Sequence, residues 1–143
     1  MEIYFSCSLT GGRDDAPVYQ QIVAYLLGRG FTVPTHHLAH PDVMHQEQIV
    51  DPFEVFQRDI NWLNGCDAVV AEVSTPSHGV GYEIAYALGL EKPVLCCFKE
   101  GTAVSKMITG NTTFGLTLAS YRAMVDLIPR LDAFLSTNFA SSS

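Results

Sequence analysis

Two carboxylates stand where a folded chain could bring them together for catalysis, and Glu83 is the first. It falls in the opening turn of an expected helix, directly after residues 74–81, a segment with two glycines and no acidic side chain. A helix N-terminus stabilises negative charge, so Glu83 could simply balance the helix dipole. The same field could instead keep it ionised as a carboxylate nucleophile. The chemical role requires a second group that converges on the same place.

Asp59 is the candidate for that second group. It lies on an expected helix over residues 51–64, beside an apolar stripe that we expect to be buried, made of Phe53, Phe56, Ile60 and Leu63. A carboxylate there is costly unless it has partners or a purpose, and a structural hydrogen bond is the alternative. Polar neighbours, Arg58 among them, are expected on the solvent side. Two carboxylates at one crevice suit glycosyl transfer, whose oxocarbenium-like transition state needs nearby negative charge.

Residues 74–81 could bind an anion such as a phosphate. Their glycines would let the backbone approach a ligand closely, and they lead into a helix N-terminus, which favours negative charge. Glycine-rich turns between strand and helix are common, so this pattern alone leaves phosphate binding and a plain connection equally open. His78 could touch the phosphate or be an incidental loop residue.

Tyr4 and His37 are further candidates. Tyr4 lies on the first expected strand, where an aromatic side chain either packs in the core or points into the crevice. His36 and His37 end the second expected strand, so one could touch a ligand while the other faces solvent. The sequence has no Ser-His-Asp order, no Walker loop and no cluster with metal-ligand spacing. We therefore predict neither a metal nor a cofactor.

The elements that must position these residues alternate between strand and helix, which predicts a single doubly wound α/β domain of the Rossmann-like or flavodoxin-like kind. We expect a five-stranded, mostly parallel sheet with helices on both faces. The strands are expected over residues 3–7, 31–36, 68–73, 93–98 and 113–118. Ligands of such sheets bind outside the carboxyl ends of the strands, where the loops 8–13, 74–81 and 99–105 would meet.

The expected helices and the remaining segments complete the chain. Helices are predicted over residues 17–27, 51–64, 80–90 and 121–135, with a loop and a short helix between residues 99 and 111. Residues 38–50 show no periodicity, which predicts a long loop. One domain is expected over residues 1–136, followed by a frayed tail over residues 137–143.

The composition favours a globular protein that acts on small molecules. Hydrophobic residues make up 48% of the 143 residues and charged ones only 16%, which favours an oligomer that covers part of its apolar surface. The net charge of −7 disfavours a nucleic-acid partner, because an acidic body repels polyanions. Four cysteines without ligand spacing predict buried free thiols. Without a signal-like or membrane-spanning run, we expect no membrane partner and a cytoplasmic protein, or a nuclear one in a eukaryote.

Several segments together resemble the nucleoside 2-deoxyribosyltransferase superfamily. They keep their order and spacing over roughly residues 3 to 110. They read YFSCS at 4–8 with GGR at 11–13, DINWL at 59–63, DAVVAEV at 67–73 and PSHGVGYE at 76–83. Within the superfamily the chain is most similar to the 2′-deoxynucleoside 5′-monophosphate N-glycosidases. Those enzymes hydrolyse such nucleotides to the free base and deoxyribose 5-phosphate.

The resemblance implies a role for each candidate. Glu83 would attack the anomeric carbon and form a covalent sugar intermediate that water resolves. Asp59 would hold the sugar hydroxyl or assist proton transfer to the leaving base, and Tyr4 would orient Glu83. The substrate-binding residues that we expect are Ser8, Gly12, His37, Ser77, Gly79, Gly81, Ser105 and Met107. Ser105 matches a residue that the family supplies to the phosphate site of the neighbouring subunit, which implies a homodimer.

Two positions depart from the family pattern. Thr10 stands where a basic residue is common, and Cys7 stands where a glycine is common. The missing basic residue bears on the preferred base or on the phosphate contacts. Arg13 lies too far along the turn to be taken as its replacement.

Three alternatives remain beside hydrolysis of a deoxynucleoside monophosphate. A deoxyribosyltransferase would move the sugar between bases, but family transferases tend to carry acidic residues before the nucleophile, and residues 74–82 have none. A cytidine monophosphate hydrolase would accept a ribose 2′-hydroxyl. A nucleotide-binding module would turn nothing over, and it would have no need for both Glu83 and Asp59.

Overall fold

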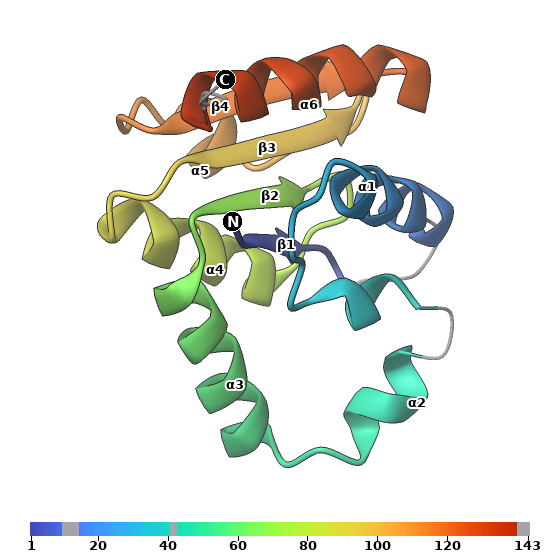
Figure 1. Ribbon diagram of the computed structural model, residues 1–143, viewed down its shortest axis with the longest axis vertical. Coiled ribbons are helices and arrows are strands. Elements are labelled where there is room, and N and C mark those ends of the chain that lie inside the picture. Colours follow the sequence, from blue (N-terminus) through green and yellow to red (C-terminus); the bar gives the residue numbers. More distant parts are fainter. Residues whose placement is uncertain (10–14, 41–42, 140–143) are drawn as a thin grey trace.

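Four parallel strands form the sheet at the centre of the structure, a computed structural model that describes residues 1–9, 15–40 and 43–139. In the described chain the strands lie in the order β1 (Ile3–Ser6), β2 (Ala68–Glu72), β3 (Val94–Lys99) and β4 (Leu116–Tyr121). All neighbours pair in parallel. β2 and β3 are rich in apolar residues on both faces, as parallel strands covered on both sides must be. Helices flank the sheet on both faces, which makes this an α/β fold of the Rossmann-like class (Figure 1).

The prediction of a strand over residues 31–36 is wrong, so the sheet has four strands and not the expected five. This segment does lie beside β1, but only Thr32 forms a bridge, to Glu2. Pro34 has no backbone N–H and cannot continue a ladder. The buried Thr35 hydroxyl takes the place of the missing backbone partner: it accepts from the Phe5 N–H at 2.9 Å and donates to the Phe5 carbonyl at 2.7 Å. A side chain therefore completes the outer edge of β1.

The helices largely follow the expected pattern. They are α1 (Ala16–Gly28), α2 (Val43–Gln48), α3 (Pro52–Gly65), α4 (His78–Gly89), α5 (Lys106–Thr109) and α6 (Met124–Asn138), with a 3₁₀ turn, η1 (His36–Ala39). The long loop expected over residues 38–50 is wrong in part, because η1 ends inside it and α2 fills much of it. α6 begins three residues later than expected and includes Thr137 and Asn138 of the expected tail.

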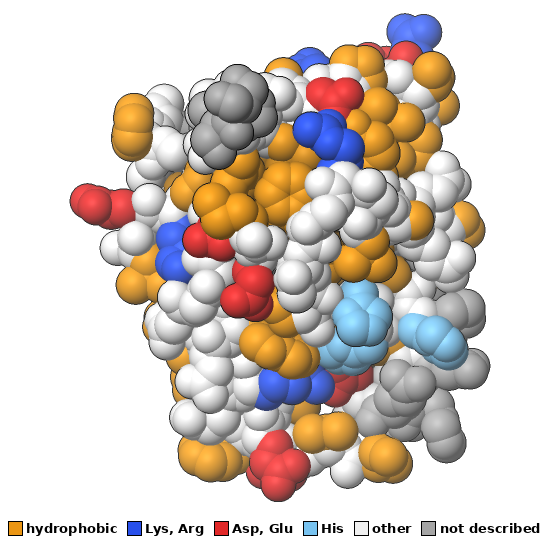
Figure 2. All heavy atoms as spheres, viewed as in Figure 1, with side chains coloured by type: hydrophobic (Ala, Val, Ile, Leu, Met, Phe, Trp, Pro, Cys, Tyr) orange, Lys and Arg blue, Asp and Glu red, His pale blue; other side chains and the backbone are white. Residues whose placement is uncertain are grey.

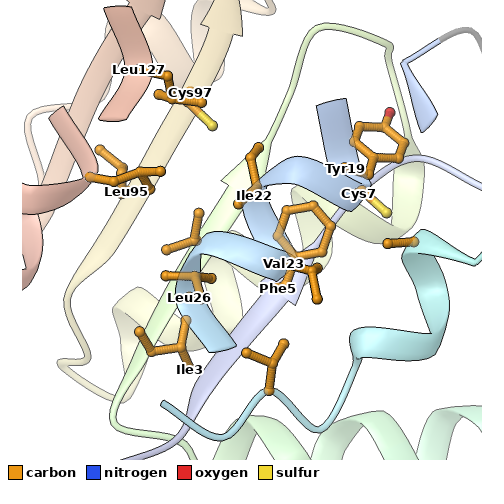
Figure 3. Packing of buried hydrophobic residues seen from close by; sticks show 14 of the residues in the cluster. Ile3, Phe5, Cys7, Tyr19, Ile22, Val23, Leu26, Leu95, Cys97 and Leu127 are labelled. Atoms are coloured by element: carbon orange, nitrogen blue, oxygen red, sulfur yellow. The ribbon is translucent and has the colours of Figure 1, made fainter. Parts of the chain in front are cut away.

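Two apolar layers hold the helices to the sheet. On one face, α1 and α6 pack against side chains that alternate along the strands, and Figure 3 shows Ile3 and Phe5 of β1 beside Ile22 and Leu26 of α1. On the other face, α3 and α4 pack against the alternate residues of the same strands, beginning with Tyr4. The alternation thus directs Tyr4 toward α3 and α4.

The apolar stripe expected on α3 is only partly buried. Leu63 is buried and Ile60 is half-buried, but Phe53 is 67% and Phe56 is 48% exposed. Figure 1 shows the reason: the first half of α3 extends beyond the edge of the sheet, where no strand lies beneath it. The start of the helix is as expected, with Asp51 accepting a hydrogen bond from the Phe53 N–H at 3.1 Å.

The four cysteines are free and buried, as expected. Among the helices in the described part of the chain, none has the length and apolar character needed to cross a membrane.

Candidate active site

The loop that leads into α4 begins at a buried carboxyl group. Glu72, fully buried at the end of β2, accepts from the Ser74 N–H at 2.6 Å and from the Ser74 hydroxyl at 3.0 Å, and it also accepts from the Tyr121 hydroxyl. Burial raises the pKa of Glu72, while the hydrogen bonds from Tyr121 and Ser74 oppose that rise. These contacts fix the start of the loop against β2 and β4.

A second set of contacts fixes the next residue of the loop. Thr75 donates to Asp15 Oδ2 at 2.8 Å, and Lys99 Nζ lies 2.5 Å from Asp15 Oδ1. Burial would raise the pKa of Asp15, but the hydrogen bonds from Lys99 and Thr75 outweigh it and hold that pKa below its ordinary value. Ser77 then caps α4 by accepting from the Val80 N–H at 3.3 Å. The start of α4 is thereby set firmly at the carboxyl edge of the sheet.

The structure brings the three predicted catalytic side chains together from β1, α3 and α4. Tyr4 is fully buried, and burial raises its pKa. The negative charges of Glu83 and Asp59 raise that pKa further, because both carboxyl groups face the Tyr4 hydroxyl. The pattern had left Tyr4 open between packing and chemistry, and its hydroxyl lies with the two carboxyl groups.

Glu83 lies in the second turn of α4 and not in the first as expected, because α4 begins at His78, and its carboxyl group is the more perturbed of the two. Burial raises its pKa to about 7. Interaction with the Tyr4 hydroxyl lowers this value, the charge of Asp59 raises it, and the charge of Arg58 lowers it. Burial also raises the pKa of Asp59, against the effect of its hydrogen bond from Arg58. Two carboxyl groups with raised pKa values at one place are typical of an acid–base site.

Several buried polar atoms at this place lack partners. Within the described residues, the Tyr4 hydroxyl, Ser6 Oγ and Glu83 Oε2 are buried and have no partner within strict hydrogen-bond limits, although the Tyr4 hydroxyl and the Glu83 carboxyl group lie close enough to interact. Ser6 lies two residues after Tyr4 on β1, so both side chains point to the face covered by α3 and α4. Buried polar atoms are nearly always paired. These atoms indicate a site that a polar ligand completes.

Gly79 borders the carboxyl group of Glu83. A Cβ atom at this glycine would lie 3.8 Å from Glu83 Oε1 and 3.9 Å from Ser77 Oγ. Both distances are ordinary contacts, so an alanine would fit the protein but would fill the space beside these oxygen atoms. The structure therefore joins Ser77 and Gly79, two predicted phosphate-binding residues, to the predicted nucleophile.

Ser105 and Met107 lie on the other side of α4. They line a cavity of about 570 Å³ between α4 and α5, together with Ser77 and Gly81. Glu83 is not among its lining residues, nor are the other two catalytic candidates. Ser105 caps α5 by accepting from the Met107 N–H at 3.2 Å, and the Met107 side chain is 82% exposed. The single chain therefore does not join these two residues to the carboxyl groups.

The remaining predicted contacts lie at the edge of the site. Ser8 is fully buried just after β1. His37 lies with its Nε2 atom 3.1 Å from Glu47 Oε1 of α2, and its ring is 5.8 Å from the ring of Trp62. Gly12 and Thr10 lie outside the described residues.

Arg58 and Glu47 belong to the site and were missed from the sequence. Arg58 was expected on the solvent side of α3, which is wrong: its side chain is only 26% exposed. It donates to Asp59 Oδ1 and to Glu47 Oε1, both at 2.9 Å. The one available signal was Trp62, four residues after Arg58 and so on the same helix face. The guanidinium lies 5.0 Å from the centre of that ring.

Histidine side chains also gather at η1 on the face shown in Figure 2. His36, His37 and His40 line a pocket of about 370 Å³ between η1 and α1. Across the described chain, no three His, Cys, Asp or Glu side chains are grouped so that they could hold a metal ion.

Comparison with known proteins places this arrangement in a family. The sequence model of the nucleoside 2-deoxyribosyltransferase family matches residues 3–127. A protein of Esox lucius named 5-hydroxymethyl-dUMP N-hydrolase is 42% identical over 115 residues, which cover 77% of this chain and 79% of that protein. A Methanococcoides burtonii protein, provisionally named 2′-deoxynucleoside 5′-phosphate N-hydrolase 1, is 37% identical over 112 residues, 78% of this chain and 92% of its own.

A solved structure shares the fold. The CMP N-glycosidase of Clostridium botulinum superposes with a TM-score of 0.68 at 16% identity, covering 92% of this chain and 99% of that one. The family match spans most of the described sheet and every candidate catalytic residue. The chain belongs to the nucleoside 2-deoxyribosyltransferase family.

Proposed function

We propose that the protein hydrolyses the N-glycosidic bond of nucleoside 5′-monophosphates, releasing the free base and a (deoxy)ribose 5-phosphate. The observation that carries this proposal is the convergence of Glu83 and Asp59 on the Tyr4 hydroxyl, on the face of the sheet covered by α3 and α4 and among unpaired buried polar atoms. The names of the relatives, which specify N-hydrolases of nucleoside 5′-phosphates, support this reaction class.

The proposed reaction has two steps. A Glu83 carboxylate oxygen attacks C1′ of the sugar, the C1′–N bond breaks, and the base leaves with the bonding electrons and takes up a proton. Water then attacks C1′ and loses a proton, and the bond from C1′ to Glu83 breaks. Asp59 holds the sugar hydroxyl or passes a proton to the leaving base. Burial raises the pKa of Asp59, which makes it a better proton donor group than an ordinary ionised aspartate. Tyr4 orients Glu83.

The sugar phosphate is proposed to lie at the start of α4. Ser77 and Gly79 are adjacent to Glu83 there, and the helix N-terminus favours a negative charge. Ser8, Gly12 and Gly81 are proposed to complete this phosphate site, with His37 near the base. A helix of twelve residues supplies the dipole.

A homodimer is proposed to complete the site. Ser105 and Met107 lie across α4 from Glu83, so they would reach the carboxyl groups of a second subunit rather than those of their own. The layer formed by α3, α4 and α5 carries exposed apolar side chains that such a dimer would cover, namely Phe53, Phe56, Tyr82 and Met107.

A chromatographic screen tests the proposed reaction. Deoxyribonucleoside monophosphates, ribonucleoside monophosphates and free nucleosides are incubated with the protein, with and without an acceptor base. We expect base release from monophosphates alone, at a rate that the acceptor does not change. Transfer of the sugar to the acceptor would instead identify a transferase. Binding without any release would identify a nucleotide-binding module and overturn the proposal.

A further inference from the structure

One arginine connects the proposed catalytic carboxyl group to the segment that carries η1 and α2. Arg58 donates from Nε to Asp59 Oδ1 at 2.9 Å. It donates from its terminal nitrogens to both oxygens of Glu47, at 2.9 and 3.5 Å. The fork of the guanidinium thus holds two carboxylates at once, which a lysine could not do.

The partners of Arg58 are themselves fixed. The Glu47 side chain is only 12% exposed, and Glu47 Oε1 also lies 3.1 Å from His37 Nε2. Trp62 packs under the Arg58 guanidinium and against the His37 ring. These contacts connect η1 and α2 to α3 beside the Asp59 side chain. In Figure 1, α2 lies away from the sheet, and this cluster is one attachment of α2 to the rest of the fold, beside the buried Val43.

The charges around the cluster act in opposite directions on the site. The groups that act on the pKa of Asp59 are Arg58 from α3, Glu47 from α2 and His37 from η1, and Asp59 in turn acts on Tyr4 of β1 and Glu83 of α4. Arg58 and His37 lower the pKa of Asp59, and Glu47 raises it. The groups that face Glu83 are Tyr4, Asp59 and Arg58, and Arg58 lowers its pKa as well. The side chains of Arg58 and Asp59 are 26% and 22% exposed, so water weakens these interactions less than it would on an open surface.

We propose that Arg58 is a positioning residue for Asp59, and that Glu47 and His37 hold Arg58 in place for this task. Arg58 fixes the direction of the Asp59 carboxylate and supplies a positive charge that favours the ionised forms of Asp59 and Glu83. The segment of η1 and α2 thereby helps to position Asp59 through Glu47 and His37. This inference rests on the proposed roles of Asp59 and Glu83.

The test compares Arg58→Gln, Arg58→Lys and Glu47→Gln with the wild type by measuring kcat and KM for base release across pH. Arg58→Gln is expected to lower kcat roughly ten- to a hundredfold, as misplaced catalytic groups do, with a smaller change in KM. The acidic limb of the pH profile of this variant moves to higher pH, because the lost positive charge no longer favours the ionised forms of Asp59 and Glu83. Arg58→Lys keeps the charge, so the limb stays near its wild-type position while kcat recovers only in part.

The signs of the pKa changes separate this role from a merely structural one. A carbon-detected NMR titration of the Asp59 carboxyl group should show a higher pKa in Arg58→Gln and a lower one in Glu47→Gln. Arg29→Gln is the matched control, since Arg29 pairs with Asp132 on the exposed surface, and it should leave the profile and kcat unchanged.

Two outcomes would overturn the proposal. One is an unchanged acidic limb and an unchanged Asp59 pKa in Arg58→Gln. The other is a loss that lies in KM alone, which would make Arg58 a contact for the substrate. Absence of base release by the wild-type protein would instead count against the proposed function, and the NMR titration would still test the Arg58 contacts.

Discussion

Burial gives Glu83 a charge state that changes close to neutral pH. Its pKa rises to about 7, mainly because the carboxyl group is removed from water. A carboxylate nucleophile must be ionised, so kcat/KM, which reports the free enzyme, should fall as the pH drops below about 7. A pH profile of base release checks this. An acidic limb near the ordinary glutamate value of 4.5 would contradict the account of this residue.

Part of this residue-scale picture could be predicted from the sequence. The acid-free loop before Glu83 and the family motifs identified Glu83, Asp59 and Tyr4, and the structure brings these three together. Asp59 was singled out for a partly wrong reason, since two of the four apolar residues in the stripe beside it are exposed. Asp59 is nevertheless only 22% exposed, and Arg58 donates a hydrogen bond to it.

Arg58 and Glu47 could not be found in the same way. Their contact joins positions eleven residues apart on two helices, so it depends on where α2 lies. Residues 38–50 lack the periodicity that would have placed a helix there. Local pattern therefore predicts the candidate catalytic residues, but not the arginine that contacts one of them.

At the scale of elements, the outer edge of β1 depends on one side chain. Thr35 is fully buried and bonds to both the N–H and the carbonyl of Phe5. Thr35→Val keeps the shape but leaves these two buried groups unpaired, which should lower the free energy of unfolding by about 2 to 4 kcal/mol. Urea denaturation measures the change.

Thr32→Val is the matched control for this prediction. Thr32 is exposed and pairs with the first residues of the chain through its backbone alone, so its side chain contributes no hydrogen bond to β1. If Thr35→Val and Thr32→Val have the same free energy of unfolding, the Thr35 hydroxyl does not stabilise the edge of β1 in place of a paired strand.

The sequence predicts the order of the elements well and their edges poorly. The four parallel strands could be predicted because runs such as residues 68–73 are apolar on both faces, although β4, an edge strand with few buried residues, begins three residues later than expected. The segment at residues 31–36 has a strand-like composition, and Pro34 signalled only that it would lie near an edge. The Thr35 hydroxyl occupies the backbone groups of Phe5 with which this segment would have paired as a strand. The spacing of apolar residues does not predict such a contact.

At the scale of the whole molecule, the site is proposed to be shared between subunits. Ser105 lines the cavity between α4 and α5 and lies across α4 from Glu83. If it serves the neighbouring site, Glu83→Ala and Ser105→Ala homodimers should each have low activity. Mixed after reversible dissociation, they should recover about a quarter of wild-type activity, because half of the random dimers carry one intact site.

The same mixing experiment has a clear contrary outcome. If Ser105 acts on Glu83 of its own chain, every mixed dimer would carry two sites with one defect each. The mixture would then be no more active than the average of the two variants. Light scattering on the wild-type protein would establish the dimer that this prediction requires.

The central claim is that Glu83 is the nucleophile of an N-glycosidic hydrolysis. The most direct measurement is base release from a nucleoside monophosphate by Glu83→Ala, with nucleotide binding followed by calorimetry. Glu54→Ala serves as control, since Glu54 is a glutamate near the start of a helix, as Glu83 is, but is exposed. The account predicts that Glu83→Ala loses base release while binding is largely retained, and that Glu54→Ala keeps both. Unchanged turnover by Glu83→Ala would contradict it.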